Sequence, residues 1–464
     1  MSADGDTPLG VSAVSAALAR GEITATDLTQ TYLARIDARD PALNSFISRT
    51  PELGLRAAVA SDARRRAGAA RGPLDGVPIA IKDNIDVAGV PTTGGIGALR
   101  GRIAETDAPV IARLKAAGAV ILGKLNMHEA AHGGTTANVA YGLCHNPHRH
   151  GYTPGGSSGG SGVAVAAGLC AAALGTDTLG SVRLPASLCG VTGFKPTQGL
   201  VSTRGVLPLC WTLDHVGALA PRVADLRMML EVMAGFDPED AVARRAPSWL
   251  TLGSGQRLQG LRLGCLNPTA IVGEPIDAEV GAAYERAIAT LRDLGASMID
   301  IELPGYNSTA LRSKAMLMME GDLAIFYADD LARDPDGFTQ ELHQGIAYGR
   351  NQNAPRMSEA YRMIRDVAPI MRAAFAKVDA LIMPTTPVPA FPFTQAMPKT
   401  LASFTALANY IGAPAATVPM GKTAGGLPLG LQIVAREWQD ARVLNIADAY
   451  ESAAKHDMAP PPAS

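Results

Sequence analysis

Strand-like and helix-like stretches alternate along most of this chain of 464 residues. The apolar, partly alternating run 76–89 predicts a strand that leads into a loop, and 278–296 has the apolar spacing of an amphipathic helix. Further strand-like runs occupy 258–268, 297–305, 378–387 and 426–435. This alternation predicts an α/β architecture in which helices cover a sheet.

The organisation into domains follows from the same pattern. Residues 8–71 are predicted to be helical, with Gly72 as a stop, and 163–174 is predicted to be a short buried helix. No low-complexity linker interrupts the rest of the chain. We therefore predict one large domain over residues 71–460, with residues 1–70 as an N-terminal helical segment packed against it.

Composition excludes several classes of function. The net charge of −2 offers no electrostatic basis for binding nucleic acid or an anionic membrane. The five cysteines are scattered without a CxxC pair, which indicates reduced thiols in a reducing compartment. The chain starts without a signal-like segment and has no apolar stretch of membrane-spanning length, so a cytoplasmic enzyme is expected.

The stretch PGGSSGGSGVAVAAG, residues 154–168, combines dense glycine with three serines. It lacks the lysine of a P-loop, and no strand precedes it, as a dinucleotide site or a GxSxG nucleophile turn requires. A glycine-rich loop that packs closely on a helix remains the plain alternative. No cofactor is expected.

Two more segments change this interpretation. Residues 173–197 hold a second serine among glycine and small apolar residues, and Lys82 closes the apolar strand PIAIK. Together, GVPIAIKDNI (76–85), the 154–168 stretch and GTDTLGSVRLPASLCGVTGFKPT (175–197) resemble the amidase signature family. The resemblance spans nearly the whole chain and implies an α/β fold with a single large domain, whose mixed central β-sheet is covered by helices on both sides.

The resemblance also implies a Ser–cis-Ser–Lys catalytic set. Ser181 would be the nucleophile, Ser157 the bridging serine after a cis peptide at Gly156, and Lys82 the base. Serine needs an adjacent base at neutral pH, and lysine serves as one only when burial has lowered its pKa. A serine hydroxyl both accepts and donates hydrogen bonds, so Ser157 suits a proton relay.

The turn before Ser181 would supply backbone N–H donors to the oxyanion, from Thr178, Leu179, Gly180 and Ser181. Family members usually carry Thr-Gly-Gly-Ser here, so Leu179 departs from the pattern and is expected either to wall the substrate pocket or to alter the turn. Structural support is expected from Gly156, Ser158, Asp177 and Arg183.

Other side chains offered rival chemistry. His128 and His132 left catalysis by histidine open, while the spacing of His145, His148 and His150 fits no standard zinc pattern, so no metal is expected. The run of Met316, Met318 and Met319 is expected to face the core, with an adaptable apolar pocket as the alternative. The substrate pocket is predicted to include Met127, His128, Met316 and Met319.

The expected activity is hydrolysis of small neutral, apolar or aryl amides, extending to esters and to carbamates or urethanes. Glutamine-dependent relatives carry an acidic residue before the segment that matches 408–419, and residues 397–410 hold none. The expected partner is thus a small-molecule amide, with no nucleic acid, no membrane and a homodimer left open. The alternatives are the A subunit of a glutamine-dependent tRNA amidotransferase and an inactive binding relative.

Overall fold

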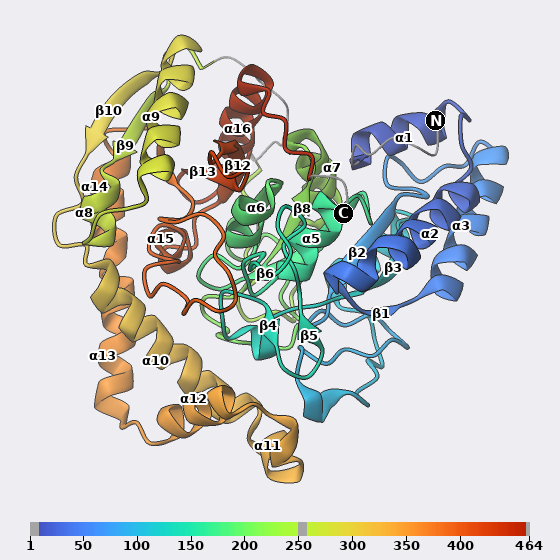
Figure 1. Cartoon of the computed structure of the whole chain (residues 1–464), viewed down its shortest axis with the longest axis horizontal. Coiled ribbons are helices and arrows are strands. Elements are labelled where there is room, and N and C mark those ends of the chain that lie inside the picture. Colours follow the sequence, from blue (N-terminus) through green and yellow to red (C-terminus); the bar gives the residue numbers. More distant parts are fainter. Residues whose placement is uncertain (1–8, 249–257, 461–464) are drawn as a thin grey trace.

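One sheet organises the computed structural model, which describes residues 9–248 and 258–460 (Figure 1). Within these residues eleven strands pair in a single mixed sheet. In spatial order they are β1 (Phe46–Arg49), β3 (Val120–Leu125), β2 (Pro78–Lys82), β6 (Ala172–Asp177), β8 (His215–Ala220), β7 (Thr192–Lys195), β12 (Ala415–Lys422), β13 (Pro428–Val434), β11 (Ala380–Pro384), β9 (Arg262–Leu266) and β10 (Ser297–Ile301). β4 (Ala137–Asn138) and β5 (Gly142–Leu143) form a separate pair.

The sheet is parallel near its two ends and antiparallel in the middle. β3, β2 and β6 run parallel, as do β11, β9 and β10, while the strands from β6 through β8, β7, β12 and β13 to β11 pair antiparallel. β2 and β6 therefore end at the same edge. This places the end of the Lys82 strand beside the turn that carries Ser181.

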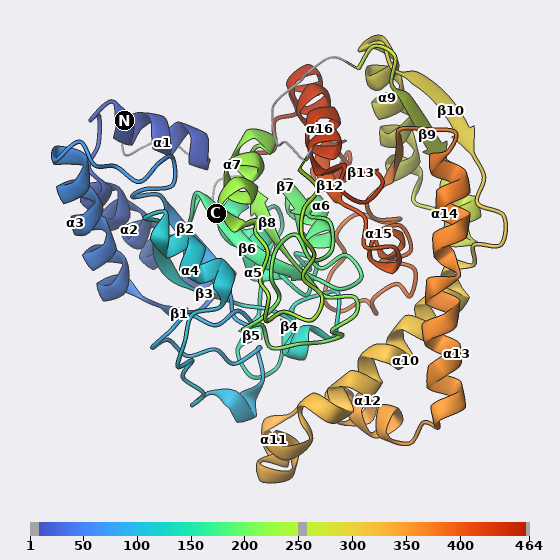
Figure 2. The same cartoon turned by 180° about the vertical axis from the view of Figure 1, so that it is seen from behind.

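Helices cover the sheet on both sides. Figure 1 looks onto α5 and α6, whereas α4 lies in front in the reverse view of Figure 2. The helices are α1 (Val11–Ala19), α2 (Ala25–Leu43), α3 (Pro51–Arg66), α4 (Pro109–Ala116), α5 (Gly159–Ala166), α6 (Arg183–Cys189), α7 (Val223–Met233), α8 (Pro268–Val272), α9 (Ala278–Asp293), α10 (Ser308–Phe326), α11 (Ala328–Arg333), α12 (Gln340–Arg350), α13 (Ala354–Arg365), α14 (Val367–Phe375), α15 (Ala406–Tyr410) and α16 (Asp440–Ala454). Short 3-10 turns lie at Gly97–Leu99, Glu129–Ala131 and Pro335–Gly337. The predicted α/β single-domain fold is confirmed.

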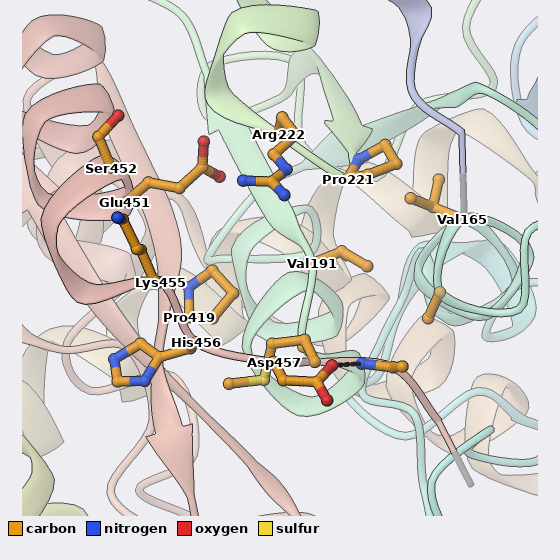
Figure 3. Close-up of a pocket in the computed structure, with 14 residues that line it drawn as sticks. Val165, Val191, Pro221, Arg222, Pro419, Glu451, Ser452, Lys455, His456 and Asp457 are labelled. Carbon is orange, nitrogen blue, oxygen red and sulfur yellow. Dashed lines mark hydrogen bonds between the residues drawn. The ribbon is translucent and has the colours of Figure 1, made fainter. Parts of the chain in front are cut away.

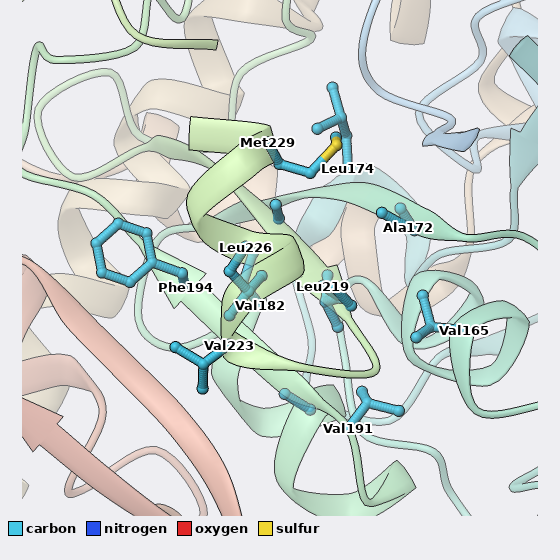
Figure 4. Close-up of a cluster of buried hydrophobic side chains, with 14 of the residues drawn as sticks. Val165, Ala172, Leu174, Val182, Val191, Phe194, Leu219, Val223, Leu226 and Met229 are labelled. Atoms are coloured by element: carbon cyan, nitrogen blue, oxygen red, sulfur yellow. The ribbon is translucent and has the colours of Figure 1, made fainter. Parts of the chain in front are cut away.

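The core consists of two large clusters of buried apolar side chains. The first lies along β2, β6, β8 and β7 with α7 and α16, and Figure 4 shows its Leu219 and Phe194 with Leu226 of α7. The second gathers α10 and α12 to α14 against β11 and α15. We call residues 308–375, from α10 to α14, the helical arm; it extends along one side of the molecule in Figure 2.

Two predictions of secondary structure were wrong. The helix predicted for 163–174 is instead α5, which ends at Ala166, followed by strand β6 from Ala172. Gly168 ends the helix region with a φ of +68°, and β6 is buried on both faces, so its sequence shows no alternation. A strand buried in this way cannot be distinguished from a buried helix by periodicity.

The N-terminal segment is not wholly helical either. β1 lies between α2 and α3 and pairs antiparallel with β3 in the main sheet. α3 ends at Arg66 rather than at Gly72, because Gly68 with a φ of +66° supplies the left-handed residue earlier. The division at residue 70 stays a prediction. Among the described residues, none of the helices is long and apolar enough to cross a membrane.

Candidate active site

The structure brings two of the three predicted catalytic side chains, Lys82 and Ser157, into contact, and the backbone of Ser181 lies beside them. Lys82 ends β2 and is fully buried, and its Nζ donates to Ser157 Oγ at 2.8 Å and to Thr176 Oγ1 at 2.7 Å. Thr176 belongs to β6, the parallel neighbour of β2. The backbone N–H of Ser158 donates to the carbonyl of Ser181 at 3.3 Å, which joins the two serine loops.

The electrostatics of Lys82 suit a base. Burial lowers its pKa to about 7, although the charges of Asp214 and Asp177 act in the opposite direction. Both close partners of its Nζ are hydroxyl groups, which stabilise the ammonium form far less than a carboxylate does. A large share of the molecules therefore carries a neutral amine at neutral pH.

Close backbone approach explains the glycines beside the serines. The Gly156–Ser157 peptide bond is cis. A Cβ on Gly156 would lie 2.8 Å from the backbone of Gly134 and Thr135, and one on Gly180, where φ is +131°, would lie 2.2 Å from Thr405 Oγ1. A side chain at either position would displace the loop packed against it.

The turn before Ser181 is held by a buried charge network. Arg183 Nη2 lies 2.8 Å from Asp177 Oδ1, and Arg183 also donates to Gln432, Asn409 and the carbonyl of Thr405. Burial alone would raise the pKa of Asp177, but Arg183 holds it well below its usual range. This is the bracing geometry expected for Asp177 and Arg183.

The four predicted oxyanion donors differ from one another. The N–H of Gly180 already donates to Asp177 Oδ1 at 2.8 Å, so it is engaged rather than available. The N–H groups of Thr178, Leu179 and Ser181 have no acceptor in the described part of the chain. Thr178 is fixed through its hydroxyl, which donates to Asp214 Oδ1 at 2.5 Å.

A cavity of about 130 Å³ opens beside Ser181. Leu179, Met316 and Met319 line it, and Met319 also belongs to the second core cluster. The prediction for Met127 and His128 was wrong, because neither side chain lines the cavity. Met127 is fully buried in the second core cluster, and the His128 ring lies behind Gly133, where a Cβ would meet it at 2.3 Å.

Sequence reasoning missed other residues of this cavity. His132 and Glu341, together with Arg312 and Lys399, bring polar and charged groups to a wall that is otherwise apolar. Arg312 shares the face of α10 with Met316 and Met319 at helical spacing, a signal that the sequence contains. Glu341 comes from the first turn of α12, so only the packing of the helical arm brings it here.

In the described part of the chain, the ring of neither His128 nor His132 has a hydrogen bond to Ser157 or Ser181. His128 donates its backbone N–H to the carbonyl of Ser157, and its Nδ1 lies 3.3 Å from Thr135 Oγ1. Burial lowers the pKa of both His128 and His132 to about 4. In the predicted histidine cluster, His148 is buried with Nε2 3.0 Å from the carbonyl of Cys189, while His145 stacks on His150.

A larger hollow of about 650 Å³ lies elsewhere (Figure 3). Its wall includes Val165, Val191 and Arg222, with Glu451 and Lys455 from the end of α16 and just beyond. None of the predicted site residues is among the described residues that line this hollow. The smaller cavity at Ser181 is therefore the candidate active site.

Comparisons with known proteins identify the family of the chain. A family profile described as Amidase matches residues 27–444. The A subunit of glutamyl-tRNA(Gln) amidotransferase from Chloroflexus aurantiacus is 41% identical over 96% of each chain. A crystal structure of the peptide amidase of Stenotrophomonas maltophilia matches with a TM-score of 0.87 and 34% identity, over 97% of this chain and 98% of that one.

The solved structure of the A subunit of glutamyl-tRNA(Gln) amidotransferase from Thermotoga maritima matches with a TM-score of 0.77 and 30% identity, over 92% of this chain and 91% of that one. The names of the two amidotransferase A subunits, from Chloroflexus aurantiacus and Thermotoga maritima, contradict the expectation of an independent amidase for small neutral, apolar or aryl amides. They also contradict the expected partners, a small-molecule amide without nucleic acid, and they do not support carbamates or urethanes.

The expectation rested on the absence of an acidic residue in 397–410, whereas the structure brings the carboxylate of Glu341 to the cavity from a distant part of the chain. The expectation about nucleic acid rested on the net charge of this chain alone, which says nothing about partners. With its fold, its serine loops and the match over residues 27–444, this chain belongs to the amidase signature family of enzymes that act on carbon–nitrogen bonds.

Proposed function

We propose that this chain is the amide-cleaving subunit of a glutamine-dependent tRNA amidotransferase. It would release ammonia from the side-chain amide of glutamine, and partner subunits would transfer that ammonia to an amino acid on tRNA. The observation that carries the proposal is the buried Lys82–Ser157 contact beside Ser181, in a chain whose curated relatives are named as subunits of such an amidotransferase. The charged rim of the cavity suits a donor that is itself an amino acid.

The first half of the reaction forms an ester on Ser181. Ser181 Oγ bonds to the carbonyl carbon of the amide while its proton passes to Ser157 Oγ, and the Ser157 proton passes to neutral Lys82 Nζ. The electron pair of the carbonyl moves to its oxygen, which the N–H groups of Leu179 and Ser181 receive. The C–N bond then breaks, and the proton returns through Ser157 to the departing nitrogen, which leaves as ammonia.

The second half regenerates the serine. Water attacks the ester carbon, giving one proton to Lys82 through Ser157, and the bond from that carbon to Ser181 Oγ breaks. The proton returns to Ser181, and glutamate leaves. A cytoplasmic location belongs to this proposal, because all five cysteines are buried and unpaired, as a reducing compartment allows.

The test compares the chain alone with the chain plus its partner subunits. Ammonia and glutamate released from glutamine are measured next to a simple anilide and a C-terminal peptide amide. We expect turnover of glutamine, increased by the partners, and its loss in Ser181→Ala. Ser187→Ala serves as the matched control, because this buried hydroxyl on α6 makes only a 3.5 Å contact with Thr386. Turnover of the anilide or peptide amide without any turnover of glutamine would overturn the proposal.

A further inference from the structure

A hollow of about 350 Å³ lies between α3 and the end of α4, and it shares no described lining residue with the active-site cavity. Four basic side chains line it, those of Arg56, Arg64, Arg71 and Lys115. The rest of its described lining consists of glycine, alanine and aliphatic residues, without a carboxylate. A wall that carries charges of one sign concentrates ligands of the opposite sign, so this hollow attracts anions.

The net charge of the whole chain hides the charge of this region. Residues 49–71 carry six arginines and two acidic residues, although the net charge of the chain is −2. One of the two acids, Asp62, accepts from two backbone N–H groups at the start of α2. The other, Glu52, is 91% exposed and lies 3.9 Å from Arg56. Exposed pairs of this kind contribute little energy, so the surface around the hollow stays positive.

Ordinary stabilisation of the fold accounts for two of the four cations. Arg64 donates to both carboxylate oxygens of Asp75, and Lys115 Nζ donates to both oxygens of Asp107, at 2.7 and 2.9 Å. Both cations also lie in the last turn of a helix, where positive charge complements the helix dipole. These contacts do not explain why two further arginines line the same hollow.

The two further arginines, Arg56 and Arg71, have donors to spare. Arg56 lies in the second turn of α3, and its side chain is 70% exposed. Arg71 is exposed beyond the end of α3, and among the described residues its guanidinium donates only to the carbonyl of Ala116, at 3.4 Å. A guanidinium has five N–H donors in a planar fork that matches the oxygens of a phosphate. Both groups are therefore within reach of a ligand and suited to phosphate.

We infer that this hollow is a phosphate-binding site that receives the sugar–phosphate backbone of tRNA. The inference rests on the proposed function, in which the amino acid to be amidated is carried on tRNA. Arg56 and Arg71 each contact a phosphate, while Arg64 and Lys115, held by their carboxylates, add positive charge. Contacts with the backbone position an RNA without reading its sequence. α3 lies at an outer edge of the molecule in both views, where a large partner has access (Figure 1 and Figure 2).

The test measures binding of a fluorescently labelled tRNA transcript to the full chain in complex with its partner subunits. In Arg56→Gln/Arg71→Gln we expect the affinity to fall about tenfold at about 100 mM salt, and the slope of log K against log salt to become shallower by about 2. Arg286→Gln/Arg292→Gln serves as the control, because it removes the same charge from exposed residues of α9, on the opposite side of the molecule (Figure 1). Hydrolysis of glutamine in the absence of tRNA is expected to be unchanged in both variants, since neither pair lines the active-site cavity.

The possible results separate the two proposals. If the wild-type complex hydrolyses glutamine and Arg56→Gln/Arg71→Gln binds tRNA as tightly and with the same salt slope as the α9 control, the phosphate site is overturned and the proposed function stands. A wild-type complex that hydrolyses glutamine but binds no tRNA also overturns the site. If the wild-type complex hydrolyses no glutamine, both proposals are overturned. Should the double variant fail to fold, the exposed Arg56→Gln alone decides, with an expected change of about 1 in the salt slope.

Discussion

Lys82 and Lys124 lie at the ends of neighbouring parallel strands, are equally buried, and differ in the groups around them. Lys124 Nζ forms an ion pair with Asp83 at 3.1 Å and donates to Thr92 Oγ1 at 2.7 Å. Lys82 has two hydroxyl partners and no carboxylate within ion-pair distance in the described part of the chain. Burial lowers the pKa of both lysines. At Lys124 the directly paired Asp83 opposes this, whereas at Lys82 the opposing charges of Asp214 and Asp177 act without an ion pair.

The comparison shows that burial alone does not make a lysine a base. Asp83 follows Lys82 in the sequence, yet its carboxylate faces Lys124. Lys195 supports the same conclusion. Burial lowers its pKa to about 7, and its Nζ donates to the carbonyl of Pro196. Lys195 is not among the described residues that line the cavity. What distinguishes Lys82 is a serine hydroxyl beside a second serine.

The largest expected effect is on turnover. Lys82→Met keeps the length of the side chain and removes the base, so kcat for the amide donor is expected to fall by about 10²–10⁴-fold. Circular dichroism should show the fold retained. A loss of less than about tenfold would mean that another group takes the proton from Ser157.

Lys124→Met is expected to lower the stability of the fold, whereas Lys82→Met is expected to lower turnover. It leaves the buried Asp83 without its cation, and such a loss costs about 3–5 kcal/mol of stability. Urea unfolding measures this free energy, with Asp83→Asn/Lys124→Met expected to recover part of it. Equal destabilisation by Lys82→Met would show that the two lysines play the same structural role.

The pH profile sharpens the comparison further. Lys82 acts as a base only when neutral, and its pKa is lowered to about 7, so kcat/KM should rise as pH increases through 7 and level off above 8. Below the pKa the slope is expected to be about tenfold per pH unit. Initial rates from pH 5.5 to 9 provide the measurement, with unfolding followed over the same range. A flat profile would count against a lysine base.

The smallest expected effect is a change of substrate preference at Leu179, in the turn before Ser181. Leu179 lines the cavity, and its carbonyl accepts from Thr405 Oγ1 at 2.6 Å. Leu179→Gly keeps that carbonyl and the backbone N–H, so stability should change by no more than about 1 kcal/mol. We expect kcat/KM to shift by a few fold toward N-substituted amides with larger groups. Competition between glutamine and γ-glutamyl anilide measures the shift, and an unchanged ratio would exclude Leu179 from substrate choice.

The alternation of strand-like and helix-like runs was sufficient to predict the α/β fold. The catalytic roles of Lys82, Ser157 and Ser181 came from the resemblance to the amidase signature family, because read locally Lys82 is only the end of a strand and 154–168 only a glycine-rich loop. The boundary between α5 and β6 was missed because a strand buried on both faces has no alternation.

The side of the cavity that α10 and α12 form was harder to predict from the sequence. Glu341 of α12 lines the cavity together with Arg312 and Met316 of α10 only because these two helices pack on each other. Periodicity describes one helix at a time and does not say which helix faces which loop. Met127 was misplaced for a related reason, since an apolar residue next to a motif is equally suited to the core.

The helical arm leaves the sheet after β10 and returns at β11, and it contributes Arg312, Met316 and Glu341 to the cavity while containing none of the three catalytic residues. In the gene, the residues that the arm contributes to the cavity thus occupy one uninterrupted block that two crossovers would exchange. Recombination among relatives can replace that block in a single event and leave the catalytic codons untouched. This wall of the cavity therefore has a short evolutionary route to change.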